Sequence, residues 1–297
     1  MAATTNPFVY GEIVTSDAFA NRVGERDRLR RDLAAGQKVF LISPRRYGKS
    51  SLVRDVLRSL AREGVLTVEV TVAASSSYVG FLESYARALV AADTPVSRLR
   101  RWTSDLLDSV RPEVRFDARI SGDSGFSLAF PAVRTARDTA RLAAEVFALP
   151  ARIAAARKQR MAIMLDEFQA VESFDEGNVE HALRAAVQDQ RAVGYVFAGS
   201  EPSLMEKMLT PKRPFYKAGP VVRLQKIDAD EFGDWLEQRF TATGITPEEG
   251  LGAAVVDLAG NVPYDVQRLA HETWDDVRDG ARRRVGLDDL HRTLTRL

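Results

Sequence analysis

Residues 39–52 constrain the fold of this chain more than any other stretch. The apolar run 39–42 predicts a short buried strand, and residues 51–60 carry apolar side chains at helical spacing. A tight turn that ends in Gly48-Lys49-Ser50 joins the two. A strand, a turn and a helix in this order form the context that a phosphate-binding loop requires, so the sequence predicts a nucleotide site here.

The chemistry of such a loop follows from its geometry. Successive backbone N–H groups surround a phosphate, and the positive end of the helix dipole points towards it. Gly48 allows close approach of the backbone, Lys49 reaches the β- and γ-phosphates, and the Ser50 hydroxyl ligates Mg²⁺. The nucleotide-binding residues predicted in this loop are Ser43, Pro44, Arg45, Arg46, Tyr47, Gly48, Lys49, Ser50 and Ser51. Ser43 replaces the first glycine of the general pattern. An ordinary strand-to-helix turn is the alternative interpretation, because a lone Gly-Lys-Ser is common.

A second landmark is the apolar run 161–165, which is followed by Asp166 and Glu167. Two carboxylates at the end of a buried strand are costly unless they have a task. In a phosphate-loop enzyme the first holds Mg²⁺ and the second polarises the attacking water. Ser200 follows another buried strand, 193–199, at the position of a γ-phosphate sensor. We therefore predict Glu167, Lys49 and Ser200 as catalytic residues, and Ser50 and Asp166 as metal ligands.

Around these landmarks the pattern alternates between strands and helices, with one insertion at about residues 95–131. The insertion carries a helical stretch, 95–111, and a β-hairpin whose turn is predicted at 121–125. A helix follows at 132–149, and Pro150 is expected to break or kink it. Beyond residue 226 the pattern is helical only, with helix starts expected at Asp228 and Thr246. We predict an ATPase domain over 1–226 and a helical lid over 227–297.

Composition narrows the function classes. Lys and Arg number 42 against 41 Asp and Glu, so the formal net charge of +1 gives no electrostatic indication of nucleic acid or membrane as a partner. No apolar run approaches the length that spans a bilayer. The chain has no cysteine, which excludes disulfides and thiolate metal sites and fits a cytoplasmic location.

Five motifs occur together in one order from the N-terminal half to the C-terminal end. They are Pro44-Arg45-Arg46-Tyr47-Gly48-Lys49-Ser50-Ser51-Leu52, Leu165-Asp166-Glu167-Phe168-Gln169, Phe197-Ala198-Gly199-Ser200, Pro214-Phe215-Tyr216 and Gly260-Asn261-Val262-Pro263-Tyr264. In this combination the chain resembles the archaeal-type ATPase family within the AAA+ and STAND P-loop ATPases. Any one motif alone would be a weak indication.

The resemblance implies an α/β fold: a five-stranded parallel sheet in the order 5-1-4-3-2, sandwiched by helices and followed by a helical lid. It also implies ATP and Mg²⁺ as ligands. Arg22, Val23 and Gly24 would lie near the adenine, and Pro263 would bring lid residues towards the nucleotide. Ser200 would take the sensor role that is more often filled by Asn or Thr.

These observations predict an ATP-binding and ATP-hydrolysing switch protein whose protein partner is unknown. Two alternatives stay open: an interaction module that binds ATP with negligible turnover, and a DNA-associated ATPase that uses the arginines at 98–101. A homo-oligomer is also left open. Arg213, in the basic loop 212–217, would then reach a neighbour's nucleotide, or would simply face solvent.

Overall fold

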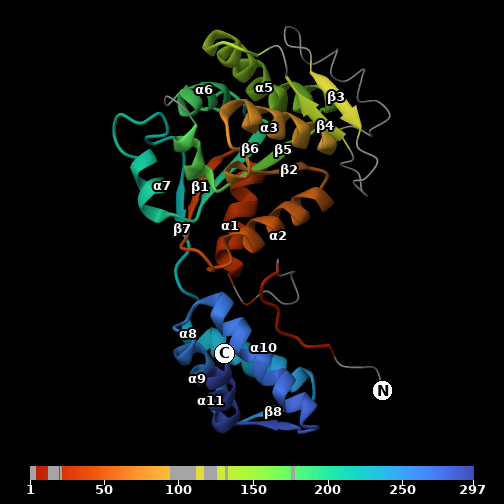
Figure 1. Ribbon diagram of the computed structural model, residues 1–297, viewed down its shortest axis with the longest axis vertical. Coiled ribbons are helices and arrows are strands. Elements are labelled where there is room, and N and C mark those ends of the chain that lie inside the picture. The colour runs from red at the N-terminus through yellow and green to blue at the C-terminus, as the bar shows by residue number, and fades with distance from the viewer. Residues whose placement is uncertain are drawn as a thin grey trace. The chain divides into compact units, whose positions relative to one another are not determined.

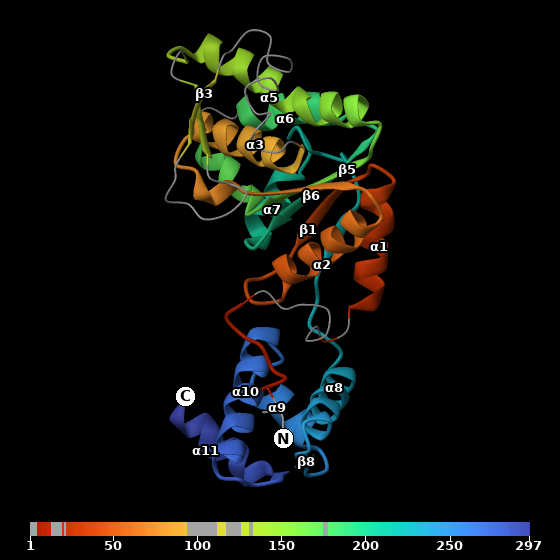
Figure 2. The same ribbon diagram turned by 90° about the vertical axis from the view of Figure 1, so that its right-hand side faces the viewer.

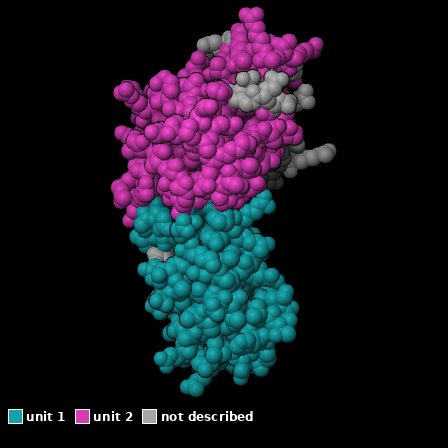
Figure 3. All heavy atoms as spheres, turned by 90° about the vertical axis from the view of Figure 1, so that its left-hand side faces the viewer, with its two compact units in different colours: residues 1–26, 43–55, 224–297 teal, residues 27–42, 56–223 magenta. Residues whose placement is uncertain are grey.

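The computed structural model of the chain describes residues 5–12, 20, 22–93, 112–116, 126–130, 133–174 and 178–297. The chain forms two compact units, coloured separately in Figure 3, and each is assembled from segments far apart in sequence. We call residues 27–42 and 56–223 the sheet unit, and residues 1–26, 43–55 and 224–297 the helical unit. Within the described ranges, no helix has both the length and the apolar character that crossing a bilayer requires.

The sheet unit is built on five parallel strands. They are β1 (Lys38–Ile42), β2 (Leu66–Thr71), β5 (Met161–Asp166), β6 (Val193–Gly199) and β7 (Val221–Arg223). Their order is β2-β5-β6-β1-β7, and every neighbouring pair is parallel. Numbered along the chain and read from the β7 edge, this order is 5-1-4-3-2. The predicted sheet is therefore confirmed.

Helices cover both faces of the sheet (Figures 1 and 2). One face carries α1 (Val23–Ala34) and α2 (Lys49–Arg62). The other carries α3 (Tyr78–Asp93), α5 (Ala136–Arg157) and α6 (Asn178–Val187), while α7 (Pro202–Met208) follows β6. Strand β6 is fully buried and β5 is buried and apolar up to its last residue, because both faces of these central strands are covered, as is typical of parallel sheets.

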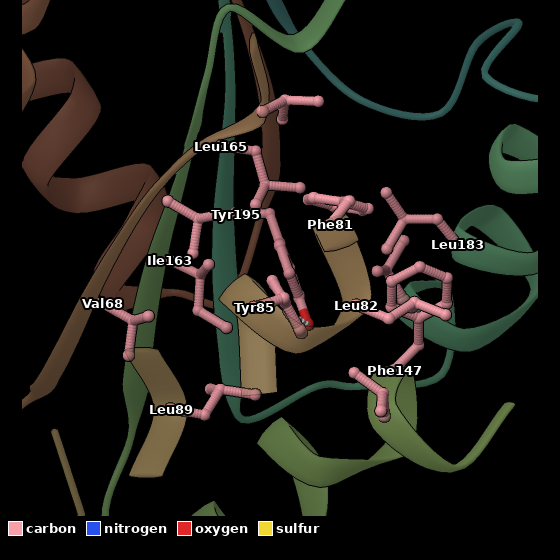
Figure 4. Packing of buried hydrophobic residues seen from close by; sticks show 14 of the residues in the cluster. Val68, Phe81, Leu82, Tyr85, Leu89, Phe147, Ile163, Leu165, Leu183 and Tyr195 are labelled. Atoms are coloured by element: carbon pink, nitrogen blue, oxygen red, sulfur yellow. Dashed lines mark hydrogen bonds between the residues drawn. The ribbon is translucent and has the colours of Figure 1, made fainter. Parts of the chain in front are cut away.

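The side chains between the sheet and α3, α5 and α6 form one continuous core. Figure 4 shows Ile163 of β5 and Tyr195 of β6 against Tyr85 of α3, with Phe147 of α5 and Leu183 of α6 beyond them. All five side chains are at most 1% exposed, so this packing fixes the strands whose ends carry the candidate site.

The predicted insertion is confirmed in its hairpin. Strands β3 (Glu113–Phe116) and β4 (Phe126–Ala129) pair antiparallel. The helical stretch predicted at 95–111 and the turn at 121–125 lie outside the described residues.

Pro150 was expected to break or kink the helix that follows the hairpin. It does not end that helix, because α5 continues to Arg157, and the kink stays a prediction. A proline inside a helix keeps a helical φ, but it removes one hydrogen-bond donor and its ring crowds the preceding turn, at a cost of about 3 kcal/mol. The buried side chains on both sides of Pro150, Leu149 and Ile153 among them, hold the helix together by packing.

The helical unit contains α8 (Ala229–Ala242), α9 (Leu251–Leu258), α10 (Pro263–Asp279) and α11 (Leu287–Arg296). Asp228 caps α8 as predicted, since its carboxylate accepts from the N–H groups of Asp230 and Glu231. The helix start predicted at Thr246 is wrong. Thr246–Pro247 is strand β8, which pairs with β9 (Arg284–Val285), and α9 begins only after Gly250.

Residues 5–12, which we call the N-terminal arm, also belong to the helical unit. Phe8 of the arm is 1% exposed and lies in the core between α8 and α10. Its ring centroid is 4.7 Å from that of Phe240 and 6.2 Å from that of Trp235. The arm is therefore a part of the unit's core.

Candidate functional site

The phosphate loop, residues 43–50, leaves β1 after Ile42 and enters α2 at Lys49. The predicted strand, turn and helix are therefore present. Arg46 (φ 69°) and Gly48 (φ 82°) both adopt left-handed backbone conformations, which lets successive N–H groups turn towards one concave side. The first turn of α2 contains no acidic residue, so the positive end of its dipole is not neutralised.

Ser43, which replaces the expected glycine, is accommodated by the loop itself. Its φ is not in the left-handed region where glycine is favoured, and its side chain is fully buried. Its hydroxyl donates to the carbonyl oxygen of Pro44 at 2.8 Å. Lys49 is only 5% exposed, so its side chain is held inside the protein and does not extend into solvent.

Arg22 joins three parts of the helical unit. Its guanidinium donates to Glu25 at 3.0 Å, to the carbonyl oxygen of Gln225 at 2.7 Å and to that of Tyr47 in the phosphate loop at 3.4 Å. The side chain is 4% exposed and the backbone is left-handed, with φ 79°. Through the bond to Tyr47, Arg22 helps to hold the phosphate loop in place.

A hollow of about 250 Å³ adjoins Arg22 within the helical unit. It is lined by five charged residues, two apolar ones and a glycine, namely Arg22, Glu25, Lys226, Asp228, Glu231, Val23, Ile227 and Gly24. Val23 is 53% exposed, which leaves an apolar surface available. The three residues predicted near an adenine therefore line one concave surface, beside carboxylates that can accept hydrogen bonds.

The two predicted carboxylates lie at one end of the sheet. Asp166 is the last residue of β5, and its Oδ1 accepts the N–H of Glu167 at 3.0 Å. In the sheet register Asp166 pairs with Ala198 of β6, and Ile42 of β1 pairs with Gly199. The carboxyl ends of β5, β6 and β1 are therefore level, which is where parallel α/β sheets carry their ligand sites.

The carboxylate of Glu167 is fixed by two donors. Its Oε2 accepts the Ser200 hydroxyl at 2.6 Å and the Gln169 side-chain amide at 2.7 Å. Ser200 and Gln169 are each 6% exposed, so these bonds are shielded from water. Ser200, predicted as a phosphate sensor, thus contacts the predicted base directly.

Sequence reasoning gave Gln169 no role of its own. Its Oε1 is buried and has no partner among the described residues. A Cβ on Gly199 would lie 2.8 Å from that oxygen and 2.4 Å from the sulfur of Met205, so a larger residue there would require the side chains of Gln169 and Met205 to shift. A glycine that precedes a polar residue at a strand end is the signal that could have indicated this close approach.

The remaining predicted residues divide between the units. Pro263 is the first residue of α10 in the helical unit, and its neighbour Tyr264 donates its N–H to the carbonyl oxygen of Arg46 at 3.3 Å. Arg213, in the sheet unit, has a side chain that is 32% exposed and is paired with carboxylates. It binds Glu172 at 2.5 Å and also Glu180. Burial raises the pKa of Glu180, and the Arg213 charge opposes that rise.

No group of three or more His, Cys, Asp or Glu side chains that could hold a metal occurs in the described part of the chain. Mg²⁺ does not require such a group, because it keeps several waters and takes one or two carboxylates together with substrate phosphates. Ser50 and Asp166 offer oxygen donors only, which is the ligand chemistry that Mg²⁺ prefers.

No protein-family model matches the chain, and no curated protein matches it. Solved structures do. The Walker-type ATPase PABY2304 of Pyrococcus abyssi superposes with a TM-score of 0.59 at 14% identity, over 95% of this chain and 72% of that one. The Aeropyrum pernix ORC1 protein, solved in complex with DNA, gives 0.60 at 14% identity, over 94% and 65%.

The RuvB Holliday junction branch migration motor of Thermotoga maritima gives a TM-score of 0.54 at 14% identity, over 95% of this chain and 72% of that one. At such low identity these likenesses show the fold alone. The fold of this chain is that of the P-loop ATPases.

Proposed function

We propose that this chain binds ATP with Mg²⁺, hydrolyses it, and acts as a switch of the AAA+ or STAND type. The observation that carries the proposal is the carboxylate of Glu167. It is held by Ser200 and Gln169 at the end of β5, level with the strand from which the phosphate loop departs. An acceptor fixed in this way is suited to orient a water molecule and to take its proton.

Each residue then has one role. The loop backbone and Lys49 bind the phosphates, Arg22 holds the loop, and residues 227–297 act as a lid. Ser50 and Asp166 hold Mg²⁺, which when bound neutralises charge on the phosphates. Glu167 accepts a proton from the attacking water, whose oxygen forms a bond to the γ-phosphorus. The bond between the γ-phosphorus and the β,γ-bridging oxygen breaks, and ADP and inorganic phosphate leave. Ser200 and Gln169 keep the Glu167 carboxylate oriented.

The first prediction tests phosphate binding. Lys49→Ala removes the side-chain charge aimed at the phosphates, so ATP affinity should fall at least about tenfold, or about 1.4 kcal/mol. Isothermal titration calorimetry with Mg-ATP measures it. Lys207→Ala, which removes an exposed lysine of the sheet unit, is the matched control and should bind like the parent. Equal affinity for Lys49→Ala and the parent would contradict the loop assignment.

Single-turnover hydrolysis with excess protein separates this proposal from an ATP-binding module without turnover. We expect ADP to form in the parent at a rate that Glu167→Gln lowers by about 10²–10⁴. ATP that stays intact on the parent would favour the non-hydrolysing module. The arginines of the DNA-associated alternative, at 98–101, lie outside the described residues.

A further inference from the structure

Arg46 belongs to the phosphate loop, yet its contacts lie on α10 of the same unit. The guanidinium carbon is 4.8 Å from the centroid of the Tyr264 ring, and Nη1 is 3.6 Å from Oδ1 of Asp265. The carbonyl oxygen of Arg46 accepts the N–H of Tyr264 at 3.3 Å. A non-glycine residue keeps a φ of 69° only where its surroundings hold it, and these three contacts supply that hold.

Tyr264 in turn contacts the N-terminal arm. Its ring meets the ring of Tyr10 edge to face, with centroids 5.9 Å apart and an interplanar angle of 88°. Tyr10 also packs against His271 at 5.0 Å, and its hydroxyl donates to Glu272 at 2.7 Å. Tyr264 therefore has the phosphate loop on one side and the arm on the other.

The arm follows the same face of α10 beyond Tyr10. His271 Nδ1 donates to the carbonyl oxygen of Phe8 at 2.6 Å, and Gln267 accepts the N–H of Val9 at 3.2 Å. The side-chain amide of Asn6 donates to Asp275 at 2.9 Å. The partners Tyr264, Gln267, His271 and Asp275 recur every three or four residues, which places them on one side of the helix.

We propose that Arg46 couples the phosphate loop to the N-terminal arm through Tyr264, so that nucleotide in the loop strengthens attachment of the arm. This inference rests on the proposed nucleotide binding. A phosphate bound by the loop N–H groups fixes the loop backbone, and with it the carbonyl and the side chain of Arg46 that hold Tyr264. Linkage then requires that an attached arm raise ATP affinity by the same factor.

The proposal differs in a measurable way from a role for Arg46 as a phosphate ligand. A ligand role predicts that Arg46→Ala weakens ATP binding while a substitution in the arm leaves it unchanged. Coupling predicts that Tyr10→Ala, a change in the arm, weakens ATP binding by about fivefold, the lower end of common couplings between sites. It also predicts that Arg46→Ala and Tyr10→Ala are not additive, because both interrupt one chain of contacts.

Calorimetry of Mg-ATP binding to the parent, Arg46→Ala, Tyr10→Ala and the double variant provides the test. Tyr10→Phe keeps the ring contact with Tyr264 and should bind ATP like the parent, although it loses the bond to Glu272. Arg278→Ala is the matched control, because Arg278 also stacks on an aromatic ring of α10, Trp274 at 5.2 Å, but its partner lies within α10 itself. It should also bind like the parent.

Hydrogen exchange at the Val9 amide gives a second readout that needs no catalysis. Without nucleotide, Arg46→Ala should speed this exchange about fivefold relative to the parent and to Arg278→Ala. ATP should slow the exchange in the parent and leave it unchanged in Arg46→Ala. The coupling would be overturned if Arg46→Ala and Tyr10→Ala had additive effects on ATP affinity. It would also be overturned if Arg46→Ala left the exchange rate of the Val9 amide unchanged. A parent that binds no ATP, with Val9 still sensitive to Arg46→Ala, would instead overturn the proposed function and leave the contact between loop and arm standing.

Discussion

At the scale of single residues, the hydrogen bonds to Glu167 distinguish two roles. Glu167 is the proposed base, and Ser200 and Gln169 orient its carboxylate. Glu167→Gln keeps the shape of the side chain but cannot accept a proton, so turnover should fall by about 10²–10⁴. Ser200→Ala leaves the carboxylate in place and removes one donor, so turnover should fall less, by about 10–100-fold. ATP affinity should change little in either variant, because the ground state does not use the base.

Steady-state kinetics with kcat and KM determined separately would check this order. Ser173→Ala is a matched control in the same segment, since the Ser173 hydroxyl donates to the carbonyl oxygen of Ala170 and not to Glu167. If Ser200→Ala raised KM and left kcat unchanged, Ser200 would act on the γ-phosphate, as first predicted, and not through Glu167. Unchanged turnover in Glu167→Gln would remove the base assignment altogether.

At the scale of elements, the start of α11 depends on one buried carboxylate. Asp289 is 7% exposed and accepts the N–H of Gly286 at 3.1 Å and an N–H of Arg282 at 2.5 Å, and it also binds Arg292. Burial alone would raise the pKa of Asp289, but these donors outweigh it and lower the pKa below the ordinary 3.8. The folded state therefore favours the ionised form.

A lowered pKa contributes stability above the ordinary value, and that stability is lost as pH falls through the lowered one. Asp289→Asn should therefore reduce the free energy of unfolding at pH 7 by about 1–3 kcal/mol. The difference from the parent should shrink as pH falls below 3.8. Urea unfolding across pH measures it, with Asp288→Asn, an exposed neighbour in the same turn, as the control. A difference that grows in acid would contradict the sign.

At the scale of the whole chain, the N-terminal arm is a structural part of the helical unit. Phe8→Ala removes a buried aromatic ring from between Phe240 and Trp235, so it should lower the free energy of unfolding by about 3–5 kcal/mol. The fluorescence of Trp235, whose ring lies 6.2 Å from that of Phe8, should report the change. Val9→Ala is the control, and an equal loss there would mean that the ring does not anchor the arm.

The parts of the fold that the sequence predicts are those fixed by local pattern. The buried strands that end at Ile42, Asp166 and Gly199 are mostly apolar runs, and the turns after them carry polar residues, so these strands were predictable. Their order in the sheet was expected only from the family resemblance. The helix start expected at Thr246 was wrong because capping residues also occur in strands. Residue 246 pairs with β9, which lies 38 residues further along the chain, so no local pattern indicates the strand.

The candidate site shows the same division. The roles proposed for Asp166 and Glu167 follow from their position at the end of a strand. The bond between Glu167 and Ser200 spans 33 residues and depends on the register of two strands, which no local pattern encodes. Likewise, nothing in the loop sequence indicates that Arg46 faces α10, because that contact needs a helix more than 200 residues away.

The attachment of the arm also has a consequence for the order of events during synthesis. Phe8 is synthesised before His271, which binds its carbonyl oxygen and is made 263 residues later. At about 5–20 residues per second, the arm waits about 13–50 s for its partner. Until α10 has been made, the Phe8 side chain cannot be buried in the complete core of the helical unit. The helical unit can therefore fold completely only after α10 has been translated. In a nascent chain that stalls before that helix, the arm would stay exposed and chaperones could bind it.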